Sequence, residues 1–556
     1  MNKKREYHSI MKSHSLHFFC CLLPLTAAAS WIQANVSVDE DDQFNYFFLD
    51  DTYEMNQEEL RASDEPDAVA SAAKELGIPE LLQNARLYKS TNRGNQRFPL
   101  DLPLLTYHTS KRGVTFTPFY NHTHNVFLTP SGLLAPDYIN LKSASFTSYI
   151  NFELAQSFAQ ELLPAVIDSL DDKLQDVYGD ICTIQLPPMF SLFEPLEIQQ
   201  RQTGSMLGFH LPCNKINFDA YVPFYYVQRN FFMNEHDKAA LNNSDFFTTL
   251  NKYFPQDPSE ADAFLKRHFV NDLFGFGDLR TIFTIPLFTH EKAKLSAGVE
   301  FTLPTNIIVK KRFMGIPYDE FPDQPHFSIF DTVNKLICAQ LDKDGALKEI
   351  TKFTTGALDR LTRIAGDVQL GRTQVGVGAQ FELTLMPDNC LSFSHALRFQ
   401  YFSSAQEVRF FRRTVGSEFN RAYDSTDDLE FLSERLTNEL YPTAKQVKVQ
   451  PGAMIEYTPS LHFDWDRWQL HLGYNIWHQT QERITNLDDN PYDLDKFDIN
   501  AAISNAATQH KLFASITWTK QYCNHIWHIG LGGDGTFAQS GIGYDWTMIG
   551  SIGLTF

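Results

Sequence analysis

The sequence has no run of 18 or more consecutive apolar residues after its amino terminus. This absence excludes transmembrane helices, which need about 20 apolar residues to cross the hydrocarbon core. Basic residues are also scarce, because 47 Lys and Arg stand against 67 Asp and Glu, which gives a net charge of −20. A chain this acidic is repelled by phosphate backbones, so nucleic acid is not an expected partner.

Cysteine is rare, with seven in 556 residues. Two of them, Cys20 and Cys21, fall in an amino-terminal leader described below, which leaves an odd number for the rest of the chain. No Cys-x-x-Cys pair or Cys/His spacing typical of zinc occurs. We therefore expect no metal site and no cofactor, and the sequence leaves the pairing of the cysteines open.

Aromatic residues, in contrast, are abundant. They make up 14% of the chain, with 47 Phe and 22 Tyr, yet the mean hydropathy is only −0.29. This combination is typical of membrane-spanning strands, because half of the residues in each strand face water and keep the average polar.

Apolar and polar residues alternate with a period of two in several stretches of the chain. Such alternation predicts strands whose two faces lie in different environments. Each stretch is close to the ~9–11 residues with which a tilted strand crosses a bilayer. The clearest stretches are 295–303, 374–385, 391–401, 455–465 and 469–476.

The last stretch, 544–556, gives the strongest signal. Its even positions are almost all apolar or aromatic and its odd positions are mostly small and polar. A strand of this kind that ends on an aromatic residue resembles the closing strand of bacterial outer-membrane β-barrels, which acts as their membrane-insertion signal. The resemblance assigns that signal to Tyr544, Trp546, Met548, Ile552, Leu554 and Phe556.

Short and long links alternate between the predicted strands. The long links are 234–278, 304–373, 413–452 and 482–510. Each short link between them has only a few residues. Outer-membrane barrels have short periplasmic turns and long outer loops. We therefore predict an all-β fold, a transmembrane antiparallel β-barrel. Eleven clear strands, a further one at 113–128 and weaker candidates at 98–109 and 145–153 predict 12 or 14 strands.

The domain organisation follows from these segments. Residues 1–34 resemble a secretory signal peptide, with basic residues before a short apolar core. Residues 35–110 are predicted to form an acidic amino-terminal extension or a periplasmic or plug segment, and residues 111–556 the barrel. Apolar residues at three- and four-residue spacing predict helical insertions in the long outer loops near 155–178, 257–273, 332–364 and 426–440.

If the apolar face of each strand meets lipid, the polar face lines the lumen. Charges of both signs lie on that face, where water or an opposite charge solvates them, and they would shape an aqueous path or pin an internal plug. The residues expected to face the lumen are Arg280, Lys294, Glu300, Glu382, Arg398, Glu456, His462, Asp464 and His471.

The segment Gly275-Phe276-Gly277-Asp278, with the hairpin that follows it to Leu303, resembles a hairpin of the outer-membrane channels for fatty acids and aromatic hydrocarbons. That resemblance implies passive import of small hydrophobic molecules without a bound cofactor. A charged lumen is a poor route for hydrophobic molecules, however. Gly277 and Asp278 also have a purely structural interpretation, as a turn glycine and the aspartate that begins a strand.

These patterns favour an outer-membrane channel or porin-like transporter for passive uptake of small molecules. One alternative is a surface adhesin or structural protein that acts through its long loops. A second is a hydrolase that uses His462 and Asp464, but no nucleophile stands out, so we predict no enzyme. The expected partners are outer-membrane lipid, lipopolysaccharide, the barrel-assembly machinery and a small-molecule solute. A homo-oligomer remains an open alternative.

Overall fold

The computed structural model describes twelve stretches of the chain, all within one compact unit, Glu65–Phe556. They are 95–104, 112–124, 197–213, 215–244, 247, 265, 270–311, 368–388, 390–411, 443–487, 497–522 and 525–556. The predicted signal peptide and the predicted insertions near 155–178, 332–364 and 426–440 lie outside these stretches.

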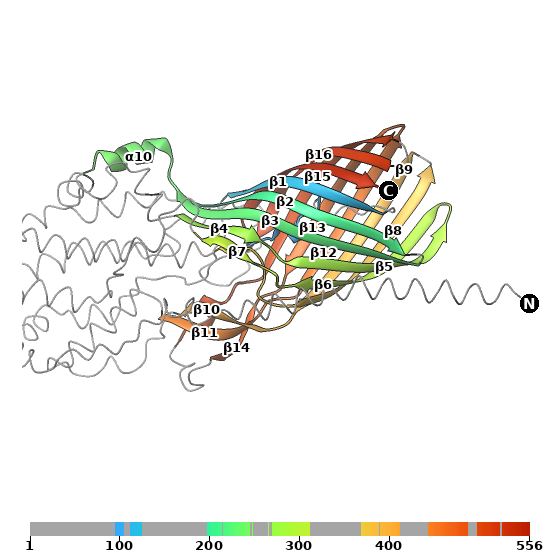
Figure 1. Cartoon of the computed structure of the whole chain (residues 1–556). Helices are drawn as coiled ribbons and strands as arrows, with labels where there is room; N and C mark the ends of the chain where they lie inside the picture. Colours follow the sequence, from blue (N-terminus) through green and yellow to red (C-terminus); the bar gives the residue numbers. More distant parts are fainter. Residues whose placement is uncertain are drawn as a thin grey trace, which may run out of the picture. The chain divides into compact units, whose positions relative to one another are not determined.

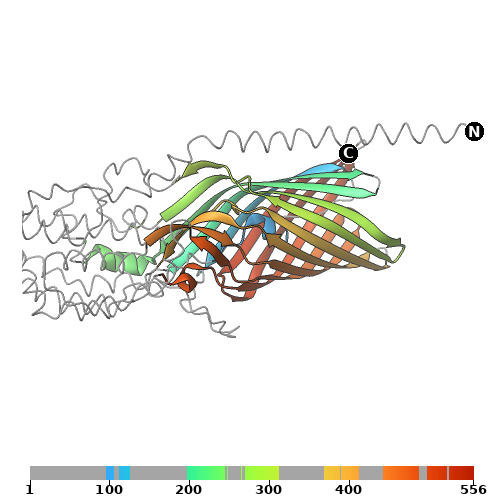
Figure 2. The ribbon, with the colours of Figure 1, turned by 90° about the horizontal axis from the view of Figure 1, so that it is seen from below.

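Twelve antiparallel strands form a closed barrel, and they run obliquely around it (Figures 1 and 2). The ring closes because β1 pairs with both β2 and β17, and β2 pairs with β3. The structure therefore decides between the predicted strand numbers in favour of 12. The strands are β1 (Gly113–His124), β2 (Glu197–Cys213), β3 (Ile216–Phe232), β5 (Leu279–His290), β6 (Ala293–Leu303), β8 (Gly376–Asp388), β9 (Leu391–Phe402), β12 (Met454–Trp465), β13 (Trp468–Gln479), β15 (Ala507–Tyr522), β16 (His525–Ser540) and β17 (Tyr544–Thr555).

The two faces of the wall differ as the alternation predicts. On β17, Met548 and Ile552 are 61% and 49% exposed on the outer face, whereas the side chains of Asp545 and Thr547 are buried on the inner face. Exposed apolar side chains around buried polar ones reverse the usual arrangement of a water-soluble protein. The outer face therefore suits lipid.

The short turns lie at one end of the barrel, where exposed aromatic side chains gather. Two-residue links join β2 to β3, β5 to β6 and β12 to β13 at this end, the right-hand end in Figure 1. Trp465, Trp468 and Trp527 are all more than 40% exposed there. Indole rings favour the membrane–water interface, so these residues form an aromatic girdle.

The opposite end carries the long connections, with one exception among the described residues. The link from β16 to β17 is only three residues long, and Gly541 in it has a φ of +71°. A Cβ at this position would lie 2.3 Å from the carbonyl oxygen of Ala506. The tight link thus requires glycine for both its backbone conformation and its close approach.

Two predicted elements differ in the structure. The strand that precedes the predicted long link 413–452 ends at Phe402, and β10 (Ala405–Phe411) joins a separate sheet with β11 (Thr443–Gln450) and β14 (Arg483–Leu487). The chain changes sheets because this second sheet buries its own core, with Phe411, Val447 and Val449 against Phe497.

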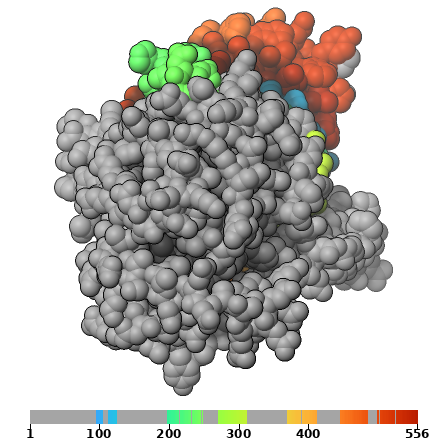
Figure 3. All heavy atoms as spheres, turned by 90° about the vertical axis from the view of Figure 1, so that its left-hand side faces the viewer, coloured from blue at the N-terminus to red at the C-terminus, as the bar shows by residue number. Residues whose placement is uncertain are grey.

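The predicted helical insertion near 257–273 is wrong over its last four residues. These belong to β4 (Val270–Phe276), which pairs with the outer half of β3 and with β7 (Ile308–Lys311). Pairing with an available sheet edge overrides the apolar spacing that favoured a helix. The short helix α10 (Glu235–Asn242), green in Figure 3, follows β3 and is capped by Asn234, whose side chain accepts the Asp237 N–H.

We expect Leu531→Arg to weaken insertion into lipid by about 2–4 kcal/mol, the cost of a cation near the bilayer midplane. Leu531 is 68% exposed and lies four residues beyond Trp527 on β16, about 10 Å along the membrane normal for a strand tilted by 40°. The measurement is the free energy of refolding into phosphocholine vesicles. Tyr522→Arg, at the short-turn rim, is the control and should cost less than about 1 kcal/mol. Equal costs at the two positions would contradict this placement of the bilayer.

Candidate functional site: a lumen closed by two chain segments

Residues 95–104, called here the lumenal segment, lie inside the barrel and are not part of its wall. The segment contains a single 3-10 turn, η1 (Pro99–Asp101), closed by the Asp101 and Leu102 N–H groups. All its residues except Gln96 and Pro103 are buried. Residues 98–104 were the start of a weak strand candidate, which the structure does not support. Pro99 and Pro103 lack the N–H groups that a ladder needs.

Contacts to strands all around the ring show that the segment is enclosed. The guanidinium of Arg97 donates to Gln509 on β15, Asn475 on β13 and Glu456 on β12, at 2.8, 2.9 and 3.2 Å. On the other side, Gln202 of β2 donates to the Arg97 carbonyl at 3.0 Å. A segment that reaches β2, β12, β13 and β15 at once must lie between them.

Buried ion pairs connect this segment to the wall. Asp101 accepts from Arg372 and Arg398 at 3.2 and 3.3 Å. Arg398 also binds Glu300 at 2.7 Å and Glu456 at 3.0 Å. Burial alone would raise the pKa of Asp101, but the surrounding arginines, with Arg372 and Arg398 foremost, outweigh it and lower the pKa. Asp101 is therefore a carboxylate, held in a cage of cations.

A second group of buried charges lies on the inner face of the last strands. Lys511 binds Asp534 and Asp545, each at 2.7 Å. Gln509 donates to Asp545 at 2.5 Å and accepts from Arg97, so it links this group to the lumenal segment. The two networks together span the lumen from β9 to β17.

The lumenal segment has an apolar side as well. Leu100, Leu102 and Leu104 pack in one buried cluster with residues of β1, β2, β3, β5, β15 and β17. The wall residues in this cluster include Phe119, Met206, Tyr221, Tyr225, Val227, Ile282, Phe513 and Ile549. The lumen thus has two different sides, an apolar side toward β1–β3 and an ionic side toward β9–β13.

A second segment, residues 368–374, enters the lumen just before β8 and is called here the lumenal strap. Gln96 and Gln369 pair reciprocally, with the Gln96 amide donating at 2.8 Å and the Gln369 N–H donating back at 3.3 Å. The Arg372 guanidinium lies 4.2 Å from the ring centroid of Phe402. The strap and the lumenal segment therefore support each other.

The Gly277-Asp278 motif fastens this strap. Asp278 is buried, and its Oδ2 accepts the Arg372 N–H at 2.6 Å. A Cβ on Gly371 would lie 2.2 Å from the other Asp278 oxygen, so a larger residue here would displace the Asp278 carboxyl. Burial raises the pKa of Asp278 to about 8, against the opposing hydrogen bond and charge of Arg372. The motif thus has a definite structural role.

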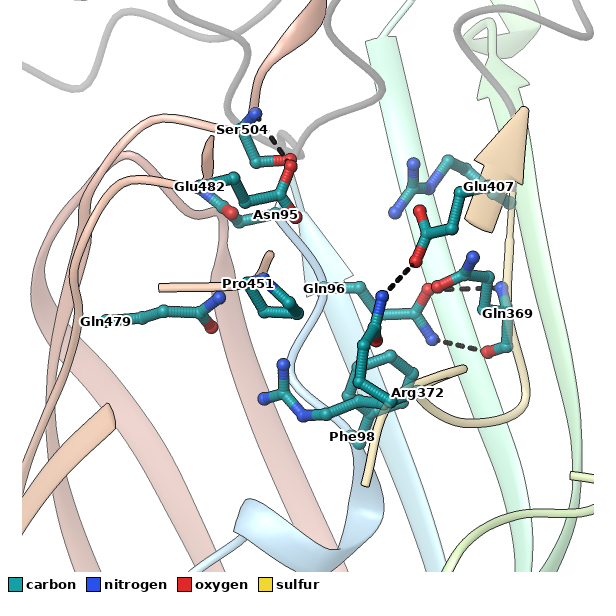
Figure 4. A pocket seen from close by; sticks show the side chains of 12 residues that line it. Asn95, Gln96, Phe98, Gln369, Arg372, Glu407, Pro451, Gln479, Glu482 and Ser504 are labelled. Atoms are coloured by element: carbon teal, nitrogen blue, oxygen red, sulfur yellow. Dashed lines mark hydrogen bonds between the residues drawn. The ribbon is translucent and has the colours of Figure 1, made fainter. Parts of the chain in front are cut away.

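Small spaces remain on both sides of the lumenal segment, an outer one toward the long loops and an inner one toward the short turns. The outer one, about 40 Å³, is lined by polar side chains of both segments and the outer wall (Figure 4). In it Gln374 donates to Glu407 at 2.6 Å, and the Ser504 N–H donates to Glu482 at 3.0 Å. The inner one, about 270 Å³, extends from Leu104 toward the short turns. In the described lumen the two segments lie between these spaces.

The structure divides the predicted lumen residues into three groups. Four of them, Arg280, Glu300, Arg398 and Glu456, come together in the buried ion network. Glu382, His462 and His471 line the inner cavity. Lys294 and Asp464 are exposed near the short turns. The predicted insertion signal lies along β17 and its end, with Met548, Ile552 and Phe556 exposed and Tyr544, Trp546 and Leu554 half-buried.

The residues considered for hydrolysis do not form a charge-relay arrangement. The Nε2 atom of His462 lies 3.2 Å from the Ser460 hydroxyl, and the His462 ring stacks on His471 at 4.0 Å. Asp464 is exposed, and Asp466 lies in the turn with a φ of 52°. In the described part of the chain, no three His, Cys, Asp or Glu residues are close enough to hold a metal ion. No helix among the described residues is long and apolar enough to cross a bilayer.

Sequence reasoning missed several charged residues of this site. Arg97, Asp101 and Arg372 lie in segments without periodicity, so nothing in their sequence places them in the lumen. Lys511, Asp534 and Asp545 lie on predicted strands at inward positions, so the alternation there offered a usable signal.

Comparisons with known proteins give only distant structural likenesses. No family model matches the chain, and no curated protein matches it. A COG4313 outer membrane channel from Pseudomonas putida F1 matches with a TM-score of 0.36 at 8% identity, over 82% of this chain and 99% of that one. The Pseudomonas putida toluene transporter TodX matches with a TM-score of 0.29 at 8% identity, over 84% and 96%.

A third likeness is to the transport unit of the Escherichia coli autotransporter AIDA-I, with a TM-score of 0.31 at 8% identity, over 88% and 98% of the two chains. The predicted resemblance to outer-membrane barrels thus finds only distant structural likenesses, a toluene transporter among them. The barrel itself is established by its own closed strand pairing.

The stability of the protein should depend on pH through Asp278. Its pKa is raised from 3.8 to about 8 in the folded protein, so the folded state holds the proton more tightly than the unfolded chain. The resulting contribution is complete below about pH 4 and is lost as the pH rises through about 8. Melting of the detergent-solubilised protein, followed by circular dichroism, should occur a few degrees lower at pH 9 than at pH 6. Asp278→Asn should remove this difference, whereas Asp466→Asn, in an exposed turn, should keep it. Equal pH dependence in all three proteins would contradict the assignment.

Proposed function

We propose that this protein is an outer-membrane channel for small molecules, with the lumenal segment as its gate. One observation carries the proposal: the described lumen is closed by segments that are separate from the wall. Among the described residues, no backbone–backbone hydrogen bond joins residues 95–104 to the barrel strands. The segment is held by side chains, so it can leave the lumen while the strand ladder stays intact.

The energetics favour a closed resting state. Breaking one partner of a buried ion pair costs about 3–5 kcal/mol, because the other charge is left uncompensated. Removing the segment would uncover several such charges, Arg372 and Arg398 among them, unless water enters with its departure. A free-energy difference of a few kcal/mol between the closed and open states keeps the open population near or below 1%. A partner or solute that prefers the open state can still raise that population.

We infer that the chain acts in the bacterial outer membrane after loss of its signal peptide. The exposed apolar belt and the short-turn aromatic girdle support contact with lipid and lipopolysaccharide. Insertion by the barrel-assembly machinery through the last strand follows from the sequence resemblance. The buried ion network supports a polar solute better than a hydrophobic one.

A surface scaffold is the second candidate. The observation that favours it is the β10–β11–β14 sheet, which has its own buried core outside the barrel wall. Such a sheet is built to keep its shape and could present the neighbouring loops to a partner. On this account the barrel would be a permanent anchor and would never conduct.

Single-channel recording in planar bilayers tests the channel. The wild type should be closed most of the time, with rare openings. Asp101→Asn removes a carboxylate that holds two arginines, worth about 1.5–3 kcal/mol for hydrogen bonds to charged groups. The open probability should therefore rise by roughly 10- to 100-fold.

Asp466→Asn, at an exposed turn position, serves as the matched control and should behave as wild type. Heat-modifiable migration on gels confirms that each protein has folded. Silence from folded wild type and folded Asp101→Asn would overturn the channel and leave the scaffold. A constantly open wild type would overturn the gate.

A further inference from the structure

The inner cavity has the chemistry of a binding site, and the proposed gate does not account for that chemistry. It lies below Pro103 and Leu104, between the lumenal segment and the short turns, and measures about 270 Å³. An engineered protein cavity of about 150 Å³ accommodates benzene. This cavity is large enough for a single ring that carries several substituents.

Eight of the 26 residues that line the cavity carry a hydroxyl group. Each can both donate and accept a hydrogen bond, and each rotates to suit a partner. They come from β1, β9, β12, β15 and β17, so they surround the cavity on most sides. The hydroxyl residues are Thr115, Thr117, Ser394, Thr458, Ser460, Ser515, Thr517 and Ser551, and three imidazoles, His462, His471 and His528, lie among them.

Charge is almost absent from the contacts that this wall can offer. Arg280 and Arg398 border the cavity but are engaged by Glu300 at 2.9 and 2.7 Å. The carboxylate of Glu382 accepts from the Ser394 hydroxyl at 3.1 Å. An anionic solute would therefore enter without an available counter-charge, which makes its desolvation costly. The bond of Glu382 is to a neutral hydroxyl, so the cavity disfavours anions more strongly than cations. An uncharged solute needs no counter-charge at all.

One side of the cavity is apolar. Leu104, Phe513 and Ile549 border it there and belong to the buried lumenal cluster. Phe513 is fixed in place by close packing, since a Cβ on Gly473 would lie 2.2 Å from its ring. A ring with an apolar face and polar edges matches a cavity with one apolar side and hydroxyls around it.

One nitrogen in the cavity wall has no partner. The Nε2 atom of His471 is buried and has no hydrogen-bond partner in the structure. The ring is held between His462, stacked at 4.0 Å, and Phe513, edge-on at 5.1 Å. An unsatisfied buried polar atom costs about 1–3 kcal/mol. Because this nitrogen is not exposed to the cavity in the structure, a hydroxyl of a bound solute satisfies it only if the imidazole turns toward the cavity.

From these observations we infer that the inner cavity binds a small uncharged polyol of single-ring size, of which a monosaccharide is the type. The cavity would be the substrate site of the channel, so this inference rests on the proposed function. A pure hydrocarbon fits worse, because it would offer no hydrogen bond to the hydroxyls of the wall while displacing their water.

Titration calorimetry with the full-length protein in detergent micelles tests the site, with D-glucose and toluene as probes. D-Glucose should bind saturably and toluene should not. His471→Phe keeps the ring stack but removes the nitrogen, and should weaken glucose binding about three- to tenfold. The double variant Ser515→Ala, Thr517→Val should weaken it by at least as much and serves if His471→Phe fails to fold. Thr289→Ala, which removes an exposed hydroxyl on β5 outside the cavity, should bind as wild type.

Three results would overturn the inference: no glucose binding, toluene binding in preference to glucose, or glucose binding that none of the cavity variants changes. Because calorimetry needs no current across a bilayer, the two proposals fail separately. Glucose binding in a protein that never conducts would reject the channel and keep the site. Gated conductance without glucose binding would keep the channel and reject the polyol.

Discussion

The pairing of charges inside a closed wall is the constraint on which the rest of the lumen depends. A carboxylate such as Glu300, wholly buried, is tolerable only because Arg280 and Arg398 compensate it. Asp101 meets the same requirement from the lumenal segment, through Arg372 and Arg398. Arg398 therefore ties the wall to the segment, because it shares its donors among acids of both. Arg372 ties the strap to the same Asp101.

This arrangement is better suited to specifying one closed state than to adding stability. Buried ion pairs contribute little net stability, because desolvation offsets their attraction, but removing one partner is costly. The apolar side of the segment adds ordinary burial of Leu100, Leu102 and Leu104. A segment seated by both kinds of contact has one well-defined position, which is what a gate requires.

The wall and many of its inward-facing side chains were predictable from sequence, whereas the two segments inside the lumen were not. Alternation fixes each strand because the two faces meet lipid and interior, and β17 shows this most clearly. Arg97 and Asp101 lie in a segment whose hydrogen-bond partners on the wall are 105 or more residues away, Gln202 the nearest of them in sequence. The break after Phe402 and the pairing of residues 270–273 with β3 likewise depend on distant partners, which no local pattern encodes.

Amide hydrogen exchange of the refolded protein, followed by mass spectrometry, tests most directly whether residues 95–104 are enclosed. Peptides that cover this segment should exchange far more slowly than an exposed chain, because the Asp101 and Leu102 N–H groups are bonded and buried. They should exchange faster than those from β12 and β15, because the gate can open while the strand ladder stays intact. Exchange within seconds, at the rate of an exposed chain, would show that the segment lies outside the barrel, and would contradict the account of a plugged lumen.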